Sequence, residues 1–196
     1  RGHPPPCRRA GGACAGAGAT AHADFLARAF AGATAIYTMI PTDYAAHDMA
    51  AEQDRLGDAI ARAVATADVK RVVNLSSVGA HVSSGTGPIA GLHRQEQRLD
   101  ELAGVDVLHV RPGYFFENHM AAIEMIRSIG AYADMTAPDS PLPMVATADI
   151  AQVIARELRT PSGKGKRVLH LRAPSLYTMK EATALLGKAI GRPDLA

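Results

Sequence analysis

The sequence predicts an α/β protein with a mainly parallel sheet, because short apolar runs alternate with amphipathic helical patterns. Three of these runs, at residues 33–40, 71–75 and 105–110, have the length and composition of buried strands. A helical pattern separates each run from the next, and a helix between two strands is the crossover that a parallel sheet requires. We therefore expect a doubly wound fold.

The helical segments each carry their own signals. A short helix is expected at residues 24–31, where Gly32 can end it. The longest helical pattern follows at residues 44–67, and a third covers residues 92–103. In the longest segment four apolar residues share one stripe that can face a core: Met49, Leu56, Ile60 and Val64.

The last third of the chain continues the alternation. Residues 116–130 predict a helix, followed by an irregular, Pro-rich stretch. Thr147 is expected to cap the next helix, and residues 166–171 predict another strand. Thr178 and Glu181 have the spacing of a capping box, which marks the start of a last helix.

Residues 1–24 stand apart from this pattern. They contain no Val, Ile, Leu, Met or Phe, and such a composition cannot bury enough apolar surface to offset the entropy of ordering. We expect this segment to be disordered or not to be a natural N-terminus, and residues 25–196 to form the folded domain. A Gly/Ala run at residues 16–20 lacks the preceding strand that a phosphate-binding loop needs, so we interpret it as low-complexity sequence.

Composition argues against several functional classes. The net charge of +2 over 196 residues offers no basic face for nucleic acid. No apolar run approaches the roughly 18 residues of a membrane span, and no signal peptide is evident, which favours the cytoplasm. Cys7 and Cys14 match no zinc or redox spacing, and the eight histidines are scattered, so no metal site is expected.

The predicted topology points to one place for a ligand. In open parallel sheets, ligands bind outside the carboxyl ends of the strands. Applied to this sequence, that rule selects residues 38–41, 75–78 and 111–116, which are polar or rich in turn residues. We expect these three strand ends to line one crevice.

Four segments carry a resemblance to a known family. They are RVVNLSSVG at residues 71–79, GLHRQE at 91–96, LHVRPGYFFEN at 108–118 and PMVATADIA at 143–151. Together they resemble the NmrA-like family of atypical short-chain dehydrogenases/reductases, and the likeness extends over about residues 25–195. The combination of RPG, an aromatic pair and EN is its most specific part.

The resemblance implies a Rossmann fold and an NADP or NAD cofactor. The family includes quinone or enone reductases and also non-catalytic redox sensors. Its members begin with a strand and a glycine-rich loop that nothing before Phe25 matches, and the acidic residue expected near Ala19 is not there. They also continue beyond the equivalent of Pro193 with a portion that helps cover the substrate. We therefore expect a Rossmann-like sheet that is incomplete at the N-terminus.

The resemblance also implies site residues. The Tyr-x-x-x-Lys pair of typical short-chain dehydrogenases is replaced by His93 and Gln97, and His93 either donates a proton or merely touches the crevice. Ser76 and Ser77 either approach the nicotinamide or satisfy backbone groups in a turn. The cofactor contacts implied are Thr38, Met39, Ile40, Pro41, Ser76, Ser77, Pro112, Gly113 and Tyr114. The substrate contacts implied are Phe115, Phe116 and Asn118, although one of the two phenylalanines is expected to fill the core.

Three functions remain open from the sequence. The first is an NAD(P)H-dependent oxidoreductase that transfers hydride to a small quinone- or enone-like substrate. The second is a sensor that binds the dinucleotide and reports redox state through a protein partner. The third is an inactive fragment, because a glycine loop normally holds the pyrophosphate and none is recognisable here.

Overall fold

The computed structural model describes residues 8–9, 12–13, 22–134 and 136–195. Of the segment predicted to be disordered or non-native, most lies outside the described residues, as does the Gly/Ala run at residues 16–20. The described part includes two short antiparallel strands, β1 (Arg8–Arg9) and β2 (Gly12–Ala13).

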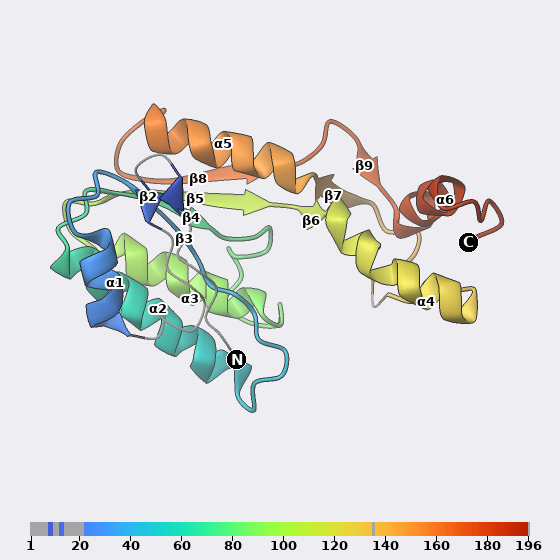
Figure 1. Ribbon diagram of the computed structural model, residues 1–196, viewed down its shortest axis with the longest axis horizontal. Helices are drawn as coiled ribbons and strands as arrows, with labels where there is room; N and C mark the ends of the chain where they lie inside the picture. The colour runs from blue at the N-terminus through green and yellow to red at the C-terminus, as the bar shows by residue number, and fades with distance from the viewer. Residues whose placement is uncertain (1–7, 10–11, 14–21, 135, 196) are drawn as a thin grey trace. The chain divides into compact units, whose positions relative to one another are not determined.

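The chain divides into two compact units. The first unit comprises Arg1–Arg111 with Arg156–Leu169, and the second comprises Pro112–Ala155 with His170–Ala196. Each is built around its own small sheet (Figure 1). No helix of the described residues is both long enough and apolar enough to cross a lipid bilayer.

The sheet of the first unit has four strands. Their order across the sheet is β3 (Ile36–Met39), β4 (Arg71–Leu75), β5 (Asp106–Pro112) and β8 (Lys166–Leu171). The first three run parallel, with β3 paired to β4 and β4 paired to β5. The backbone bonds from Val107 N to Gly165 O and from Gly113 N to Leu171 O advance by six residues on both strands, so β8 is also parallel. The predicted α/β fold with a mainly parallel sheet is confirmed.

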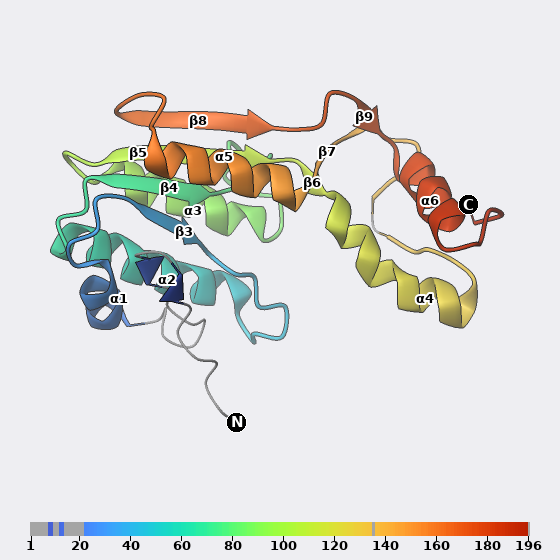
Figure 2. The same cartoon turned by 45° about the horizontal axis from the view of Figure 1, so that its top comes forward.

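Two helices connect consecutive strands of this sheet and a third precedes β3, and Figure 2 shows all three together on one side of the sheet. They are α1 (Ala23–Phe30), α2 (Met49–Thr66) and α3 (Ile89–Asp100). Three residues of the predicted stripe on α2, Leu56, Ile60 and Val64, are buried, and each contributes about 1.5–3 kcal/mol by leaving water. The core they form with the sheet and the other two helices includes Leu26, Ile36, Val72, Leu99 and Val107.

The start of α2 differs from the prediction by five residues. The Asp48 side chain accepts a hydrogen bond from Ala51 N at 2.9 Å and so caps the helix, which begins at Met49. Earlier in the chain, Asp43 accepts from Ala45 N at 2.9 Å and holds a separate turn. The sequence from residue 44 onward is compatible with a helix, but these two local side-chain bonds decide where it begins.

The second unit contains a three-stranded sheet with the order β6 (Tyr114–Phe115), β7 (Leu142–Val145) and β9 (Leu176–Tyr177). The stretch predicted to be irregular extends to Pro143, and the prediction is wrong for its last two residues, which begin β7. Two-residue strands and a Pro within β7 leave no period-two pattern to detect, and β7 forms because β6 and β9 pair with its two edges.

The helices of the second unit follow the same chain order as predicted, with changed details. The expected helix at residues 116–130 is a 3-10 helix, η2 (Phe116–Ala121), followed by α4 (Ala122–Ile129). The capping box at Thr178 and Glu181 is confirmed at the start of α6 (Met179–Ala189), where Glu181 N donates to Thr178 Oγ1 at 3.1 Å.

The helix α5 (Thr147–Arg159) begins one residue earlier than a capping role for Thr147 predicts. Thr147 does not act as the cap but stands as the first residue of the helix. Its backbone N donates to Glu117 Oε1 at 2.9 Å, and its hydroxyl donates to the same carboxylate at 2.6 Å. Glu117 therefore satisfies the helix terminus from 30 residues away, which local sequence cannot reveal.

Gly113 is required by a close backbone approach within the second unit. A Cβ atom at this position would lie 1.9 Å from Pro143 O, which belongs to β7. Backbone on both sides leaves no flexible side chain that could move away. The glycine of the RPG motif therefore has a structural reason in the pairing of β6 with β7.

Replacing Gly113 with Ala should destabilise the protein by about 1–3 kcal/mol or more, because the strands must separate to admit the methyl group. Gly163→Ala is the matched control. The atoms nearest to its added Cβ belong to the flexible Arg167 side chain, so its stability should stay within about 1 kcal/mol of the parent. Urea unfolding followed by circular dichroism measures both. Equal stability of the two variants would contradict the assignment.

Candidate functional site

The carboxyl ends of β3, β4 and β5 lie at one edge of the first unit's sheet, because the three strands are parallel (Figure 2). This edge carries the predicted residues 38–41 and 76–77, and α3 brings His93 to the loop that follows β4. The remaining predicted residues, from Pro112 onward, belong to the second unit. Each group is described within its own unit.

A line of side-chain hydrogen bonds crosses the three strands beneath this edge. Thr38 Oγ1 donates to Asn74 Oδ1 at 3.2 Å, and Asn74 Nδ2 lies 3.2 Å from His109 Nδ1. An amide nitrogen only donates, so Nδ1 is the acceptor and His109 carries its hydrogen on Nε2, 3.0 Å from Asp100 Oδ1. Each of these four side chains therefore has a hydrogen-bond partner, and the Thr38 hydroxyl is bonded to the neighbouring strand rather than being free for a ligand.

Along β3 and the two residues that follow it, side chains alternate between core and surface. Ile40 is buried in the core with Ile36, whereas Met39 is 44% exposed and Pro41 is exposed. Of the four residues predicted to run along a cofactor, the structure therefore presents two, Met39 and Pro41, to the outside of the first unit. Thr38 and Ile40 stabilise the strand from the inside.

The two serines after β4 differ in their surroundings. Ser76 is buried, and its backbone N donates to Val110 O at 2.8 Å. Its hydroxyl makes no hydrogen bond of normal geometry to a described residue, although it lies close enough to Glu96 to help lower that residue's pKa. Ser77 Oγ donates to Val78 O at 2.9 Å, which is the turn interaction considered from the sequence. The Ser76 hydroxyl is therefore next to Glu96 at the strand end.

His93 is anchored to the loop that follows β4. Its Nδ1 lies 2.8 Å from Ala80 O, and a carbonyl oxygen only accepts, so this nitrogen carries hydrogen. In the neutral ring Nε2 then has a lone pair, and it donates only when the ring is doubly protonated. The hydrogen bond to Ala80 O thus makes neutral His93 a hydrogen-bond acceptor at Nε2. The only chemical role that the sequence suggested for His93 is proton donation.

One turn along α3, Glu96 forms a buried ion pair with Arg111 at the end of β5. Arg111 Nε donates to Glu96 Oε1 at 2.9 Å, and Arg111 Nη2 donates to the other carboxylate oxygen. The side chains are only 7% and 12% exposed. Burial alone would raise the pKa of Glu96, but the Arg111 guanidinium outweighs it and holds that pKa below the usual value. The pair ties α3, and with it His93, to the strand edge.

The predicted residues of the second unit lie in β6 and η2. Tyr114 OH donates to Asp134 Oδ2 at 3.3 Å, and Phe115 is half-buried. Phe116 packs edge-on against Tyr177, with ring centroids 5.5 Å apart, in a small core cluster. Asn118 is exposed. Pro112 and Gly113 are buried, and Gly113 has the structural role described above.

Several polar residues of these two regions were given no role of their own in the sequence analysis. In the first unit they are Asn74, Glu96, Asp100 and Arg111, and in the second unit they are Glu117, Tyr132 and Asp134. Each acts through a partner distant in sequence, so no local spacing marks it. Asn74, Glu96, Arg111 and Glu117 lie within the segments that carry the family likeness, and Arg111 also lies at a strand end that the topology selects.

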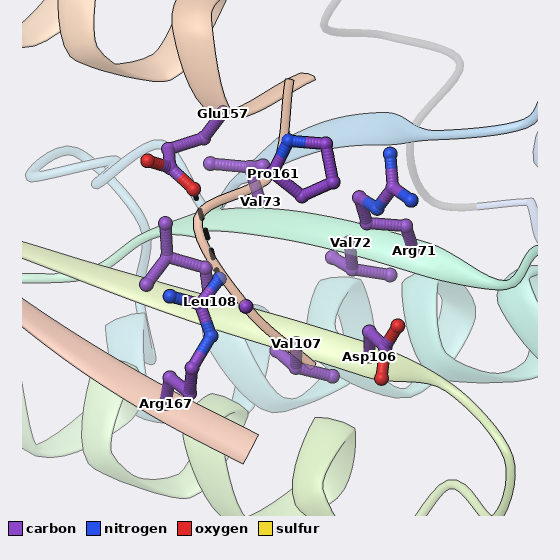
Figure 3. Close-up of a pocket in the computed structure, with 10 residues that line it drawn as sticks. Arg71, Val72, Val73, Asp106, Val107, Leu108, Glu157, Pro161 and Arg167 are labelled. Carbon is purple, nitrogen blue, oxygen red and sulfur yellow. Dashed lines mark ion pairs between the residues drawn. The ribbon is translucent and has the colours of Figure 1, made fainter. Parts of the chain in front are cut away.

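A small cavity in the first unit lies at the opposite end of the sheet (Figure 3). It is lined at the first residues of β4 and β5, Arg71 and Asp106, and by Glu157 and Arg167. The Glu157 carboxylate accepts from Ser162 N at 3.0 Å and lies 3.6 Å from Arg167 Nη2. Its volume of about 10 Å³ admits at most one water molecule, so it is not a ligand site.

The parallel sheet and its helices define a protein of the Rossmann-like α/β class. Within that class the chain belongs to the NmrA-like family, whose model matches residues 12–194. This confirms the family suggested by the four sequence segments. Among the described residues no group of three or more His, Cys, Asp and Glu side chains could hold a metal ion.

Two curated proteins illustrate the relationship. A (4-alkanoyl-5-oxo-2,5-dihydrofuran-3-yl)methyl phosphate reductase of Streptomyces griseus subsp. griseus is 30% identical over 134 residues, which cover 68% of this chain and 47% of that protein. An NAD(P)H azoreductase of Xenophilus azovorans is 28% identical over 142 residues, covering 72% and 49%. The chain thus spans about half the length of the curated relatives it matches.

A solved structure shows the same fold. The NADPH-dependent quinone oxidoreductase of Escherichia coli, complexed with NADPH, superposes with a TM-score of 0.72 at 22% identity. The match covers 88% of this chain and 57% of that one.

Replacing Glu96 with Gln should lower stability by about 3 kcal/mol at pH 7, because Arg111 would remain buried without its counter-charge. The folded-state pKa of Glu96 lies below its unfolded value, so the pair stabilises above about pH 4.5 and this contribution is lost as pH falls further. The difference between parent and variant should therefore shrink between about pH 5 and pH 3. Urea unfolding at several pH values measures it.

Glu101→Gln is the control for this prediction, because Glu101 is exposed at the end of α3. Its stability should match the parent within about 0.5 kcal/mol at every pH. A pH-independent difference for Glu96→Gln would show that the ion pair does not set the pKa of Glu96.

Proposed function

We propose that this protein binds NADPH or NADH at the strand-end edge of its first unit and reduces a small quinone- or enone-like molecule. The observation that carries the proposal is the grouping of Ser76 and an anchored His93 at the carboxyl ends of parallel strands. That is where open α/β sheets bind nucleotides. The relatives support the oxidoreductase part of this function.

The residues at this edge fit a dinucleotide. A hydroxyl can donate one hydrogen bond and accept two, so Ser76 would bind a ligand group in addition to Glu96. Met39 and Pro41 offer exposed apolar surface beside it, and Gly79, with φ +89°, opens the loop that follows. These residues would hold the nicotinamide half of the cofactor. When bound, the cofactor would supply the hydride.

His93 would act on a proton near the reduced molecule. With Nδ1 held by Ala80 O, only Nε2 can face a ligand. In the neutral state it would accept a hydrogen bond from a hydroxyl group, and in the protonated state it would donate to a carbonyl oxygen. Reduction of a quinone or enone needs one proton for each hydride, and protonated His93 could provide it.

The relatives support a reductase. The azoreductase and the quinone oxidoreductase are both named for reduction with a nicotinamide cofactor. The compound in the name of the dihydrofuran reductase has an oxo group conjugated with a ring double bond, which is the enone type of acceptor. Quinones and enones share that conjugated carbonyl.

A redox sensor is the second candidate. The helix α3 carries His93 and Gln97 where typical short-chain dehydrogenases carry Tyr and Lys, and Gln97 is exposed. A sensor would bind the dinucleotide without oxidising it and would use a protein partner. Binding and turnover must therefore be measured separately.

Calorimetric titration of the 196-residue chain with NADPH, and separately with NADH, should give a Kd near the micromolar range, about −8 kcal/mol. Ser76→Ala should weaken binding about fivefold or more through the lost hydrogen bond. Ser128→Ala, at an exposed position in the second unit, is the control and should bind as the parent does. A folded chain that binds neither nucleotide would refute both the reductase and the sensor.

For turnover, NADPH oxidation should be followed at saturating quinone or enone in the protein that binds the nucleotide. His93→Ala should lower kcat at least tenfold while the Kd for NADPH stays within threefold. His81→Ala changes an exposed histidine of the neighbouring loop and should leave kcat unchanged. Binding without oxidation of NADPH by any acceptor would favour the sensor.

A further inference from the structure

We propose that the second unit holds a binding site for a small polyhydroxylated molecule of about monosaccharide size. The site is a cleft between residues 132–134 and 136–139 on one side and the first turns of α6 on the other, with a volume of about 360 Å³. Clefts from about 300 Å³ upward are typical of small-molecule sites. Lys180 N donates to Pro138 O at 3.0 Å and so joins the two sides. This inference does not depend on the proposed function.

The chemistry of the lining favours hydroxyl groups. Three lining residues, Tyr132, Thr136 and Thr183, carry hydroxyls that both donate and accept hydrogen bonds. Asp134 and Asp139 add acceptors, and Lys180 adds a donor. A ligand whose own groups both donate and accept can pair with all of these, and a hydroxyl is the simplest such group.

The Tyr132 hydroxyl is held in place from behind. His119 is 5% exposed, and its Nδ1 lies 2.8 Å from Tyr132 OH, with the two rings edge-on at 5.7 Å. Tyr114 also packs against the imidazole, at a centroid distance of 5.4 Å. The rotation of the Tyr132 ring is thereby restricted, which reduces the entropy lost on binding a ligand.

His119 also determines what the Tyr132 hydroxyl can do. Burial lowers the pKa of His119, so the ring is neutral at pH 7 and Nδ1 either accepts from Tyr132 or donates to it. In the first case the phenol oxygen accepts from a ligand, and in the second the phenol hydrogen is free to donate. His119 Nε2 is buried and has no partner among the described residues. The Tyr114 hydroxyl also lies close enough to the Tyr132 hydroxyl to affect the pKa of both phenols. A ligand hydroxyl can pair with either state of the Tyr132 hydroxyl.

The charges of the cleft disfavour an anionic ligand. Asp134 accepts from Thr136 N at 2.8 Å and from the Tyr114 hydroxyl. Burial alone would raise its pKa, but these hydrogen bonds keep the pKa below its usual value, and the carboxylate is charged. With Asp139 it outweighs the single ammonium of Lys180, which forms no ion pair with a described residue. Neutral hydroxyl groups avoid this repulsion.

The test uses myo-inositol and D-glucose as probes of the full 196-residue chain, with binding measured by saturation-transfer NMR. Saturable binding in the millimolar range is expected for at least one probe. Cyclohexanol, a ring of similar size with one hydroxyl, should bind at least fivefold more weakly. Absence of saturable binding for both probes, or equal affinity for cyclohexanol, would overturn the proposal.

Variants locate the site. Tyr132→Phe should weaken binding at least fivefold, because the ring remains and only the hydroxyl is lost. Tyr44→Phe removes the same group at an 81% exposed position of the first unit and should leave the affinity within twofold. Unchanged affinity for Tyr132→Phe would place the probe elsewhere and refute the site.

A second pair tests His119 as a positioning residue that acts through Tyr132. His119→Phe should weaken binding, whereas His119→Asn, which keeps a polar atom near the position of Nδ1, should recover part of the affinity. Circular dichroism melting establishes that each variant is folded, and Tyr132→Phe decides the proposal if either is not. Equal losses for folded His119→Phe and His119→Asn would exclude this positioning role.

Discussion

The hydrogen-bonded line from Thr38 through Asn74 and His109 to Asp100 is the constraint on which the strand-end site depends. It joins neighbouring parallel strands by side chains as well as by backbone, and a shift of one residue in register would place each polar group on the opposite face. An unpaired polar group there would cost about 1–3 kcal/mol. The complete pairing therefore favours a single register, and the register sets where the strand ends lie.

The same face holds the Glu96–Arg111 pair, which extends the constraint from the sheet to α3. Both side chains are nearly buried, so each charge needs the other to remain in place. His93 lies three residues before Glu96 on the same helix and is held independently by Ala80 O. Two anchors, one from the sheet and one from the loop, thus orient a single imidazole. This matters for function because they leave Nε2 as the ring atom available to a ligand.

The second unit is organised by different means. Gly113 lets two backbone segments approach each other closely. Glu117 accepts a hydrogen bond from a backbone N–H at the start of α5, and Phe116 packs in a small core cluster. Three residues of the most family-specific block therefore have structural reasons that do not involve a ligand. The polar chemistry of this unit lies instead around Tyr132, Asp134 and His119, where a buried histidine supports a phenol at the wall of a cleft.

The sequence by itself determined the fold class, the family and most of the helices and central strands. It did so because apolar periodicity, capping pairs and glycine stops are local signals, and residues 71–75 and 166–171 match the observed strands without change. It also identified the strand-end segments through a general rule of parallel sheets. The roles implied for the individual site residues stay predictions.

Only the tertiary structure decided which side chains are free to act. Thr38 and Ile40 face the interior although Met39 and Pro41 beside them do not, and His93 has its tautomer set by a carbonyl 13 residues away. Glu117 caps a helix that begins 30 residues later, and Tyr132 is supported by a histidine from η2. These pairings connect positions far apart in the chain, and a local sequence pattern contains no information about which distant partner the fold will supply.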